Sequence, residues 1–239
     1  MKSLPHSIVK FSCLLSWLGL TACSTPHLPL PVSGGTGARD ELAEQVRSRR
    51  KLSVLFVGNS YSFGVPMAFS KLAAQRGKTV RTGHSTYGGW SLAQHADHAA
   101  TLEKIRSDWD IVVIQEQSRI PSLPPDKRDA AMFPPLQTLV SEVRKRGAVP
   151  LLYQTWGRRD GDEFVEGDNF HAMNARLRSG YQAAAQASGG VVVAPVGDAW
   201  EKEFQAGRGA GLFMDDGSHP TAVGDQLTAG VFYEVLFGK

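Results

Sequence analysis

Residues 52–60 read Leu-Ser-Val-Leu-Phe-Val-Gly-Asn-Ser, a mostly apolar run that ends in a glycine and a polar turn. A nearly continuous apolar run of this length is typical of a strand that is buried on both faces of a parallel sheet. A serine directly after such a strand lies at the head of the next helix, where backbone N–H groups stabilise negative charge. The stretch therefore predicts an α/β fold and a candidate reactive hydroxyl, Ser60.

Further apolar runs recur along the chain and alternate with segments of helical pattern. The predicted strands cover 52–57, 79–82, 111–114, 149–153 and 191–194. The predicted helices cover 65–76, 92–106, 126–146, 170–187 and 221–237, and we expect Pro134-Pro135 to kink or split the third of them. This alternation predicts a three-layer α/β/α domain with a five-stranded parallel sheet. In such sheets ligands bind beyond the carboxyl ends of the strands, so functional residues should follow each strand.

The composition of the chain excludes several classes of protein and of site. The chain has 239 residues, of which 42% are hydrophobic and 21% charged, which excludes a collagen repeat, a coiled coil and a disordered tail. Apart from residues 47–51 there is no basic run in the folded part, so nucleic acid is not an expected partner. Cys13 and Cys23 both lie in the first tenth of the chain. A disulfide framework and a cysteine-ligated zinc site are therefore excluded from the folded domain.

The N-terminus has the pattern of a secretory signal. A basic start, a short apolar stretch and a small-residue ending predict a signal peptide over residues 1–22. Leu20-Thr21-Ala22-Cys23 resembles the lipobox of bacterial lipoproteins, which implies a lipidated Cys23 and a membrane anchor. An ordinary signal peptide with an incidental cysteine is the alternative. The serine after Cys23 implies an outer-membrane protein of the bacterial cell envelope that faces the periplasm.

Proline and glycine punctuate the segment that follows. Residues 23–39 contain few charges and are predicted to be a flexible tether. The folded domain is then expected to cover residues 40–239, which is long enough for a single core.

Four more candidate residues follow the predicted strands or precede the last helix. Asp216 and His219 are three residues apart, so the carboxylate can accept a hydrogen bond from the imidazole and leave its other ring nitrogen free to act as a base. Gly89, in a Gly-Gly turn, can bring an N–H group close to an oxyanion, and Gln117 can aim its amide at the same place. Each feature also has a structural explanation, namely a helix cap, a helix-entry turn, a tight turn or a satisfied strand end.

Taken together, these features resemble one family. Gly58-Asn59-Ser60, Gly89, Gln117 and Asp216-x-x-His219-Pro220 look like blocks I, II, III and V of the SGNH/GDSL hydrolase superfamily, in the right order. The resemblance covers residues 52–230 and implies a flavodoxin-like fold and a serine esterase. It implies that His219, oriented by Asp216, deprotonates Ser60. It also implies an oxyanion hole made by the N–H groups of Ser60 and Gly89 with the Gln117 side chain, and no metal or cofactor.

Two positions depart from the family pattern. Asn59 stands where the first block usually has Asp, and Gln-Glu-Gln-Ser at 115–118 replaces the usual Gly-x-Asn-Asp. Gln117 is therefore a substitute for the oxyanion asparagine, with Gln115 or Gln154 as alternatives. Loss of one oxyanion donor costs on the order of 100- to 1000-fold in turnover, so the substitution bears on the rate more than on the reaction class.

Other polar and aromatic residues are weaker candidates for a functional role. Trp156 and Arg158 follow the fourth strand and open a long loop, so either could contact substrate, although an aromatic residue could equally pack against the rim. His84, His95 and His98 have no carboxylate or cysteine pattern to complete a metal site, and none is predicted.

The sequence therefore favours an envelope esterase that removes small acyl groups, with O-acetyl groups on envelope carbohydrate as the candidate substrate. A lipase or thioesterase for longer acyl chains ranks second, because residues 160–169 offer few apolar side chains. The non-enzymatic alternative is a domain of the same fold that binds cell-wall polysaccharide or a partner lipoprotein. The departure at 115–118 favours this alternative, and the presence of Ser60, Asp216 and His219 argues against it.

Overall fold

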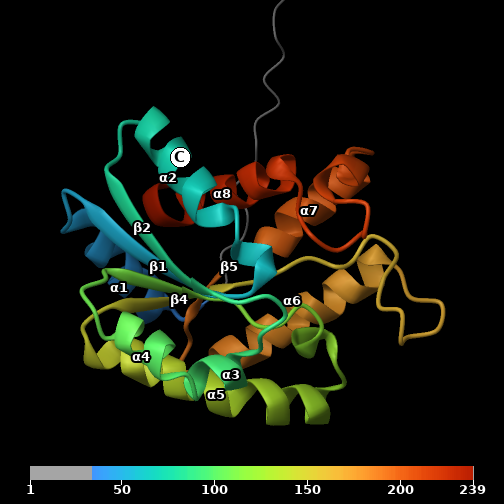
Figure 1. The fold of residues 1–239 in the computed structure, drawn as a ribbon, viewed down its shortest axis with the longest axis horizontal. Coiled ribbons are helices and arrows are strands. Elements are labelled where there is room, and N and C mark those ends of the chain that lie inside the picture. The colour runs from blue at the N-terminus through green and yellow to red at the C-terminus, as the bar shows by residue number, and fades with distance from the viewer. Residues whose placement is uncertain (1–33, 239) are drawn as a thin grey trace, which may run out of the picture.

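Five parallel strands form the sheet at the centre of the molecule, in the order β2-β1-β3-β4-β5 (Figure 1). The computed structural model describes residues 34–238. The strands are β1 Leu52–Gly58, β2 Val80–Thr86, β3 Ile111–Ile114, β4 Val149–Tyr153 and β5 Val192–Ala194. This is the flavodoxin-like strand order, and the predicted three-layer α/β/α domain is confirmed.

Helices cover both faces of the sheet. The α-helices in the described residues are α1 Thr36–Arg47, α2 Val65–Gln75, α3 Leu92–Ala96, α4 Ala99–Ile105, α5 Pro125–Lys145, α6 Phe170–Ala187, α7 Val196–Gln205 and α8 Ala222–Phe237. Short 3-10 helices are η1 Ser60–Ser62, η2 Ile120–Ser122 and η3 Gly209–Leu212. Figure 1 shows α2, α7 and α8 on one side of the sheet and α3 to α6 on the other.

The hydrophobic core has two halves, one on each face of the sheet, and β1 contributes side chains to both. Val54 and Phe56 pack with residues of α1, α2, α7 and α8, whereas Leu55 and Val57 pack with residues of α3, α4, α5 and α6. All four side chains are at most 1% exposed. The apolar run is continuous rather than alternating because both faces of this central strand are buried.

Strand β2 and the segment after it differ from the predicted elements for local reasons. Strand β2 runs on to Thr86, and within it Gly83 leaves room for the ring of Trp109, which a Cβ at that position would overlap. The predicted helix over 92–106 is two helices, α3 and α4. His98 stands between them in extended conformation as the N-cap of α4, and its Nδ1 lies 3.0 Å from Thr101 Oγ1.

Two further helices differ from the prediction. Of the kink or split expected at Pro134-Pro135, the split does not occur, because α5 runs without a break through both prolines. Pro134 is exposed, and the carbonyl groups that lose an N–H partner there can bind water instead. Helix α7 lies in a segment for which the sequence predicted no helix.

Helix α1 begins at Thr36, so the predicted tether extends four residues too far. Its start is fixed by the N–H of Gly35, which donates to the carbonyl of Gly190 at 3.0 Å. Leu42 is the one fully buried side chain of this helix, which left too weak a periodic pattern to predict it.

The predicted signal peptide and lipidated Cys23 lie outside the described residues. Within residues 34–238, none of the helices combines the length and the apolar character needed to cross a membrane.

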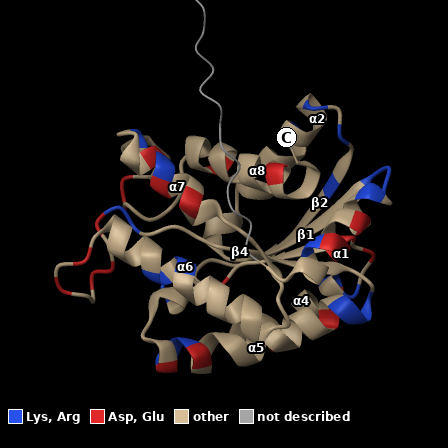
Figure 2. Cartoon of the chain, turned by 180° about the vertical axis from the view of Figure 1, so that it is seen from behind, with Lys and Arg blue, Asp and Glu red and all other residues tan. Residues whose placement is uncertain are grey.

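Figure 2 shows Lys and Arg residues gathered near α1 and the starts of β1 and β2, and Asp and Glu residues on a loop at the opposite end of the molecule. Lys and Arg cluster in segments such as 47–51, 76–78 and 144–146, where helices end and strands begin. Cations are stabilised there by the negative ends of the helix dipoles. The loop at 154–169, between β4 and α6, instead carries five acidic and two basic residues. The carboxyl edge of the sheet is therefore the acidic one.

Gly180 in α6 provides a test of the packing behind the carboxyl edge. A Cβ at this position would overlap the Pro121 carbonyl group, whose carbon would lie only 2.8 Å away. We predict that Gly180→Ala lowers the free energy of unfolding by about 2 kcal/mol, measured by urea denaturation, because rigid backbone must move.

Gly230 in α8 is the matched control, because a Cβ there would meet nothing within 4 Å. Gly230→Ala should raise the free energy of unfolding by roughly 0.5–1 kcal/mol. Equal effects of the two substitutions would contradict the described packing of α6 on η2.

Candidate active site

The turn after β1 places Ser60 at the start of the short helix η1, which precedes α2. Asn59 caps the short helix η1, and its Oδ1 accepts the N–H of Tyr61 at 3.1 Å. The side-chain oxygen of Gln115 accepts two more hydrogen bonds, from the N–H of Asn59 at 2.9 Å and from Ser62 Oγ at 3.0 Å. The turn that carries Ser60 is therefore tied to the end of β3, the neighbouring strand.

Ser60, His219 and Asp216 come together in space, as the sequence predicts. Ser60 Oγ lies 2.9 Å from Nε2 of His219, and Nδ1 of His219 lies 2.5 Å from Oδ2 of Asp216. The second oxygen of Asp216 accepts the N–H groups of Ser218 and His219, at 2.9 and 3.0 Å. These contacts fix the imidazole with a proton on Nδ1 and leave Nε2 free to accept the serine proton.

The pKa of Asp216 is shifted to suit this arrangement. Partial burial raises it, but the hydrogen bonds from the His219 side chain and from the N–H groups of Ser218 and His219 outweigh that effect. The pKa of Asp216 falls to about 2. The carboxylate therefore stays ionised over the whole physiological range and can stabilise an imidazolium at His219.

Aromatic rings support the histidine from behind. The Tyr61 ring lies edge-on to the His219 ring at 5.6 Å, and Tyr61 Oη lies 2.5 Å from Ser218 Oγ. Trp156 is stacked between Tyr61 and Trp200, with ring centroids 4.7 and 3.8 Å away. These rings fix the position of the loop that carries His219.

The prediction that Trp156 contacts substrate is contradicted. Its side chain is fully buried, and its indole N–H donates to the carbonyl of Ser218 at 3.1 Å. The packing alternative considered for this residue is the one that the structure supports. Arg158 keeps a side chain that is 23% exposed and pairs with Glu163 at 3.0 Å, so it remains a candidate for substrate contact.

Of the three glutamines weighed for the oxyanion, two are engaged elsewhere. Gln115 is fully buried, and its amide nitrogen donates to the carbonyl of Glu116. Gln154 is 2% exposed, and its amide nitrogen donates to Asp198 at 2.8 Å. Neither amide can reach a substrate without losing a buried partner.

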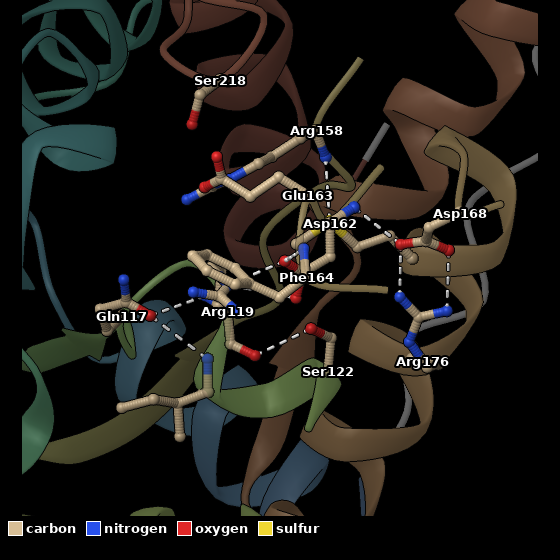
Figure 3. Close-up of polar contacts among 12 residues, drawn as sticks. Gln117, Arg119, Ser122, Arg158, Asp162, Glu163, Phe164, Asp168, Arg176 and Ser218 are labelled. Carbon is tan, nitrogen blue, oxygen red and sulfur yellow. Dashed lines mark hydrogen bonds and ion pairs between the residues drawn. The ribbon is translucent and has the colours of Figure 1, made fainter. Parts of the chain in front are cut away.

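Gln117 is the remaining candidate. Its side-chain oxygen accepts the N–H groups of Arg119 and Ile120, at 2.8 and 3.3 Å. Figure 3 shows the amide nitrogen on the side away from these two groups. This nitrogen makes no hydrogen bond within residues 34–238, so the side chain is fixed by its oxygen while its donors stay free.

The turn after β2 is joined to the turn after β1. Gly89 has a φ of +74°, a conformation that glycine adopts without strain. The side-chain amide of Asn59 donates to the carbonyl of Trp90 at 3.2 Å, next to Gly89. An ionised aspartate cannot donate this hydrogen bond, which gives a physical reason for asparagine at the position where the family pattern has Asp.

Sequence reasoning missed the importance of Glu116. This side chain is fully buried, and its Oε1 accepts the N–H of Leu92 at 2.9 Å and the N–H of Gln117 at 2.6 Å. It therefore joins the segment after Gly89 to the segment that carries Gln117. Burial raises the pKa of Glu116 to about 7. A charged residue directly after a buried strand was the signal that could have found it.

The histidines that were weighed as metal ligands have other roles. His95 is fully buried, and its ring nitrogens lie 2.9 Å from the carbonyl of Gly58 and 3.2 Å from Thr101 Oγ1. Burial is the main reason that its pKa falls to about 4, so the ring is neutral at physiological pH. Residues 34–238 contain no group of three or more His, Cys, Asp or Glu side chains suited to hold a metal ion.

The raised pKa of Glu116 predicts a pH dependence of stability. Between its usual value of 4.5 and about 7, the folded protein keeps a proton that the unfolded chain releases, so stability falls as the pH rises. Glu116→Gln removes this titration. We predict that the stability of the wild-type chain relative to Glu116→Gln falls by on the order of 3 kcal/mol across this range.

Denaturant unfolding of the two proteins at a series of pH values measures this difference. The titration of His95 is common to both proteins and cancels. A difference that stays constant with pH would contradict a buried, protonated Glu116.

Comparisons with known proteins bear on the fold. The sequence matches no protein-family model and no curated protein. A DUF4886 family protein from Bacteroides uniformis is 21% identical with a TM-score of 0.69, over 79% of this chain and 84% of that one. The lipase/acylhydrolase from Enterococcus faecalis is 16% identical with a TM-score of 0.55, over 76% of this chain and 93% of that one.

A third solved structure is an acetylxylan esterase from Geobacillus stearothermophilus. It is 16% identical with a TM-score of 0.57, over 79% of this chain and 95% of that one. Because these identities are low, the comparisons establish only that the chain shares the fold of these proteins. The chain has the three-layer α/β/α fold of the SGNH/GDSL hydrolases.

Proposed function

We propose that this chain is a serine hydrolase of carboxylic esters. The observation that carries the proposal is the hydrogen-bonded row from Ser60 Oγ through His219 to Asp216, with separations of 2.9 and 2.5 Å. A serine hydroxyl is a weak nucleophile, and an oriented imidazole is the base that it needs. A domain that only binds polysaccharide or a partner lipoprotein has no use for this row, which makes the non-catalytic alternative the weaker one.

The reaction follows from the geometry. His219 Nε2 takes the proton of Ser60 as its oxygen attacks the ester carbonyl carbon, and the imidazolium then protonates the departing alcohol. The N–H groups of Ser60 and Gly89 and the Gln117 amide are the proposed donors to the oxyanion. Water, deprotonated by His219, releases the acyl group and restores Ser60.

Two considerations support a small acyl group on a carbohydrate. Among the structures with this fold, one is described as an acetylxylan esterase. The acidic loop 154–169 at the carboxyl edge disfavours anionic substrates by charge repulsion. We further propose that the lipobox-like Cys23 anchors the enzyme to the bacterial envelope, close to acylated polysaccharides.

Hydrolysis of longer acyl chains is the second candidate, and one cavity favours it. A cavity of about 430 Å³ lies between α2 and α8 and begins at Gly64, close in sequence to Ser60. Met67 and Leu72 are among its apolar lining residues. Asp225 also lines it, however, and its carboxyl is a poor neighbour for an acyl chain. We therefore rank this function below the hydrolysis of small esters.

Hydrolysis of p-nitrophenyl acetate tests the proposed function. Ser60→Ala should lower kcat by at least about 1000-fold, because the nucleophile is lost. Ser107→Ala is the control, since Ser107 is an exposed helix-end residue whose hydroxyl donates only to the Glu103 carbonyl. It should leave kcat unchanged.

The same assay with p-nitrophenyl palmitate separates the two candidate functions. A small-ester hydrolase turns over the acetate far faster, whereas a preference for the palmitate would favour the longer-chain alternative. Ser60→Ala with turnover close to that of the wild-type chain would show that Ser60 is not the nucleophile.

A further inference from the structure

We propose that Phe164, stacked on Arg119, forms a platform for a sugar ring at the rim of the site and selects esters of neutral carbohydrates. The inference rests on the proposed ester hydrolysis and names its substrate class. It assigns substrate recognition to a loop residue in place of the buried Trp156.

Phe164 is exposed and yet held in place. It is 71% exposed, and the Arg119 guanidinium carbon lies 4.0 Å from the centre of its ring (Figure 3). Its N–H donates to Oδ1 of Asp162 at 3.2 Å. One ring face is covered by the guanidinium, and the high exposure leaves the rest of the ring open. The contact with the Arg119 guanidinium orients the ring at the surface and leaves its remaining area accessible to a ligand.

Buried ionic contacts hold the platform. Nε of Arg119 lies 3.0 Å from Oδ1 of Asp162, whose side chain is only 3% exposed. The N–H of Asp162 donates to Asp168 at 2.7 Å, and Asp168 forms an ion pair with Arg176 of α6 at 2.6 Å. An aromatic ring set on this network can accept a ligand with little loss of side-chain entropy.

The loop that carries Phe164 is joined to both sides of the candidate active site. On one side, the N–H of Arg119 donates to the side chain of Gln117 at 2.8 Å. On the other side, the N–H of Arg159 donates to the carbonyl of Gly217 at 2.8 Å, between Asp216 and His219. The loop therefore spans from the proposed oxyanion donor to the base, and Phe164 lies on its exposed part.

The chemistry of the loop favours a neutral sugar over an acyl chain or an anion. The less polar face of a pyranose packs its C–H groups on an aromatic ring and removes apolar area from water. Glu163 and Glu166 lie within two residues of Phe164 in the sequence and are exposed, so their carboxylate oxygens can accept hydrogen bonds from sugar hydroxyls. The same carboxylates repel an anionic polymer, and a single ring among them offers no continuous apolar channel.

A comparison of two acetate esters tests the platform. Methyl tetra-O-acetyl-glucoside presents a sugar ring, and ethyl acetate presents none. Phe164→Ala should raise KM for the glucoside about tenfold, and the ratio of kcat/KM for the glucoside to that for ethyl acetate should fall by a similar factor. Phe164→Trp, which keeps a stacking ring, should restore the ratio.

Val165→Ala is the matched control, because Val165 is the exposed apolar neighbour on the same loop at 43% exposure. Val165→Ala should leave KM and kcat/KM unchanged for both esters. An unchanged ratio in Phe164→Ala, or an equal fall in Val165→Ala, would overturn the platform and leave the ester hydrolysis standing.

A direct binding measurement keeps the two proposals separate. If the wild-type chain hydrolysed neither ester, the proposed function would fail, and binding of the unacylated sugar cellohexaose would still test the platform. Isothermal titration should then show a dissociation constant about tenfold weaker for Phe164→Ala than for the wild-type chain. No binding by the wild-type chain, or equal binding by both, would overturn the platform.

Discussion

The side-chain oxygen of Gln115 is the contact on which the candidate site depends. It accepts the N–H of Asn59 and the hydroxyl of Ser62, on either side of Ser60, and so fixes the turn at the end of β1 to the end of β3. Gly58 is required beside it, because a Cβ there would lie only 3.0 Å from Cβ of Gln115. This junction is where the strand order reverses direction along the sheet, which is the usual ligand position in such folds.

Behind the exposed triad lies a layer of buried polar groups that joins the turns to one another. Glu116 connects the segments after β2 and β3, His95 contacts the last carbonyl of β1, and Asn59 connects the turns after β1 and β2. Groups in such a layer are costly to leave unpaired, so each contact restricts the others. The turns that carry the proposed oxyanion donors Ser60, Gly89 and Gln117 are therefore hydrogen-bonded to one another, and stabilisation of an oxyanion requires donors that are positioned in advance.

The sequence was sufficient for the sheet because the strands other than β2 are buried, mostly apolar runs between turn residues, whereas the largely polar β2 extends beyond its predicted end. The three-residue spacing was sufficient to pair Asp216 with His219, and the resemblance to the SGNH/GDSL blocks implied their pairing with Ser60. The sequence was insufficient for α1, where a single buried leucine leaves no periodicity, and for Trp156, because exposure cannot be read from residue type. The choice among the glutamines required the hydrogen-bond partners of each amide, which depend on tertiary contacts between distant segments.

The central claim is that Ser60 is a nucleophile activated by His219, and covalent trapping tests it most directly. The chain would be treated with a fluorophosphonate, and the modified peptide would be located by mass spectrometry. The account predicts one adduct, on Ser60, whose rate of formation falls sharply in His219→Ala while Ser107→Ala reacts at the wild-type rate. An unmodified chain, or an adduct on another residue such as Ser62 or Ser118, would contradict the account.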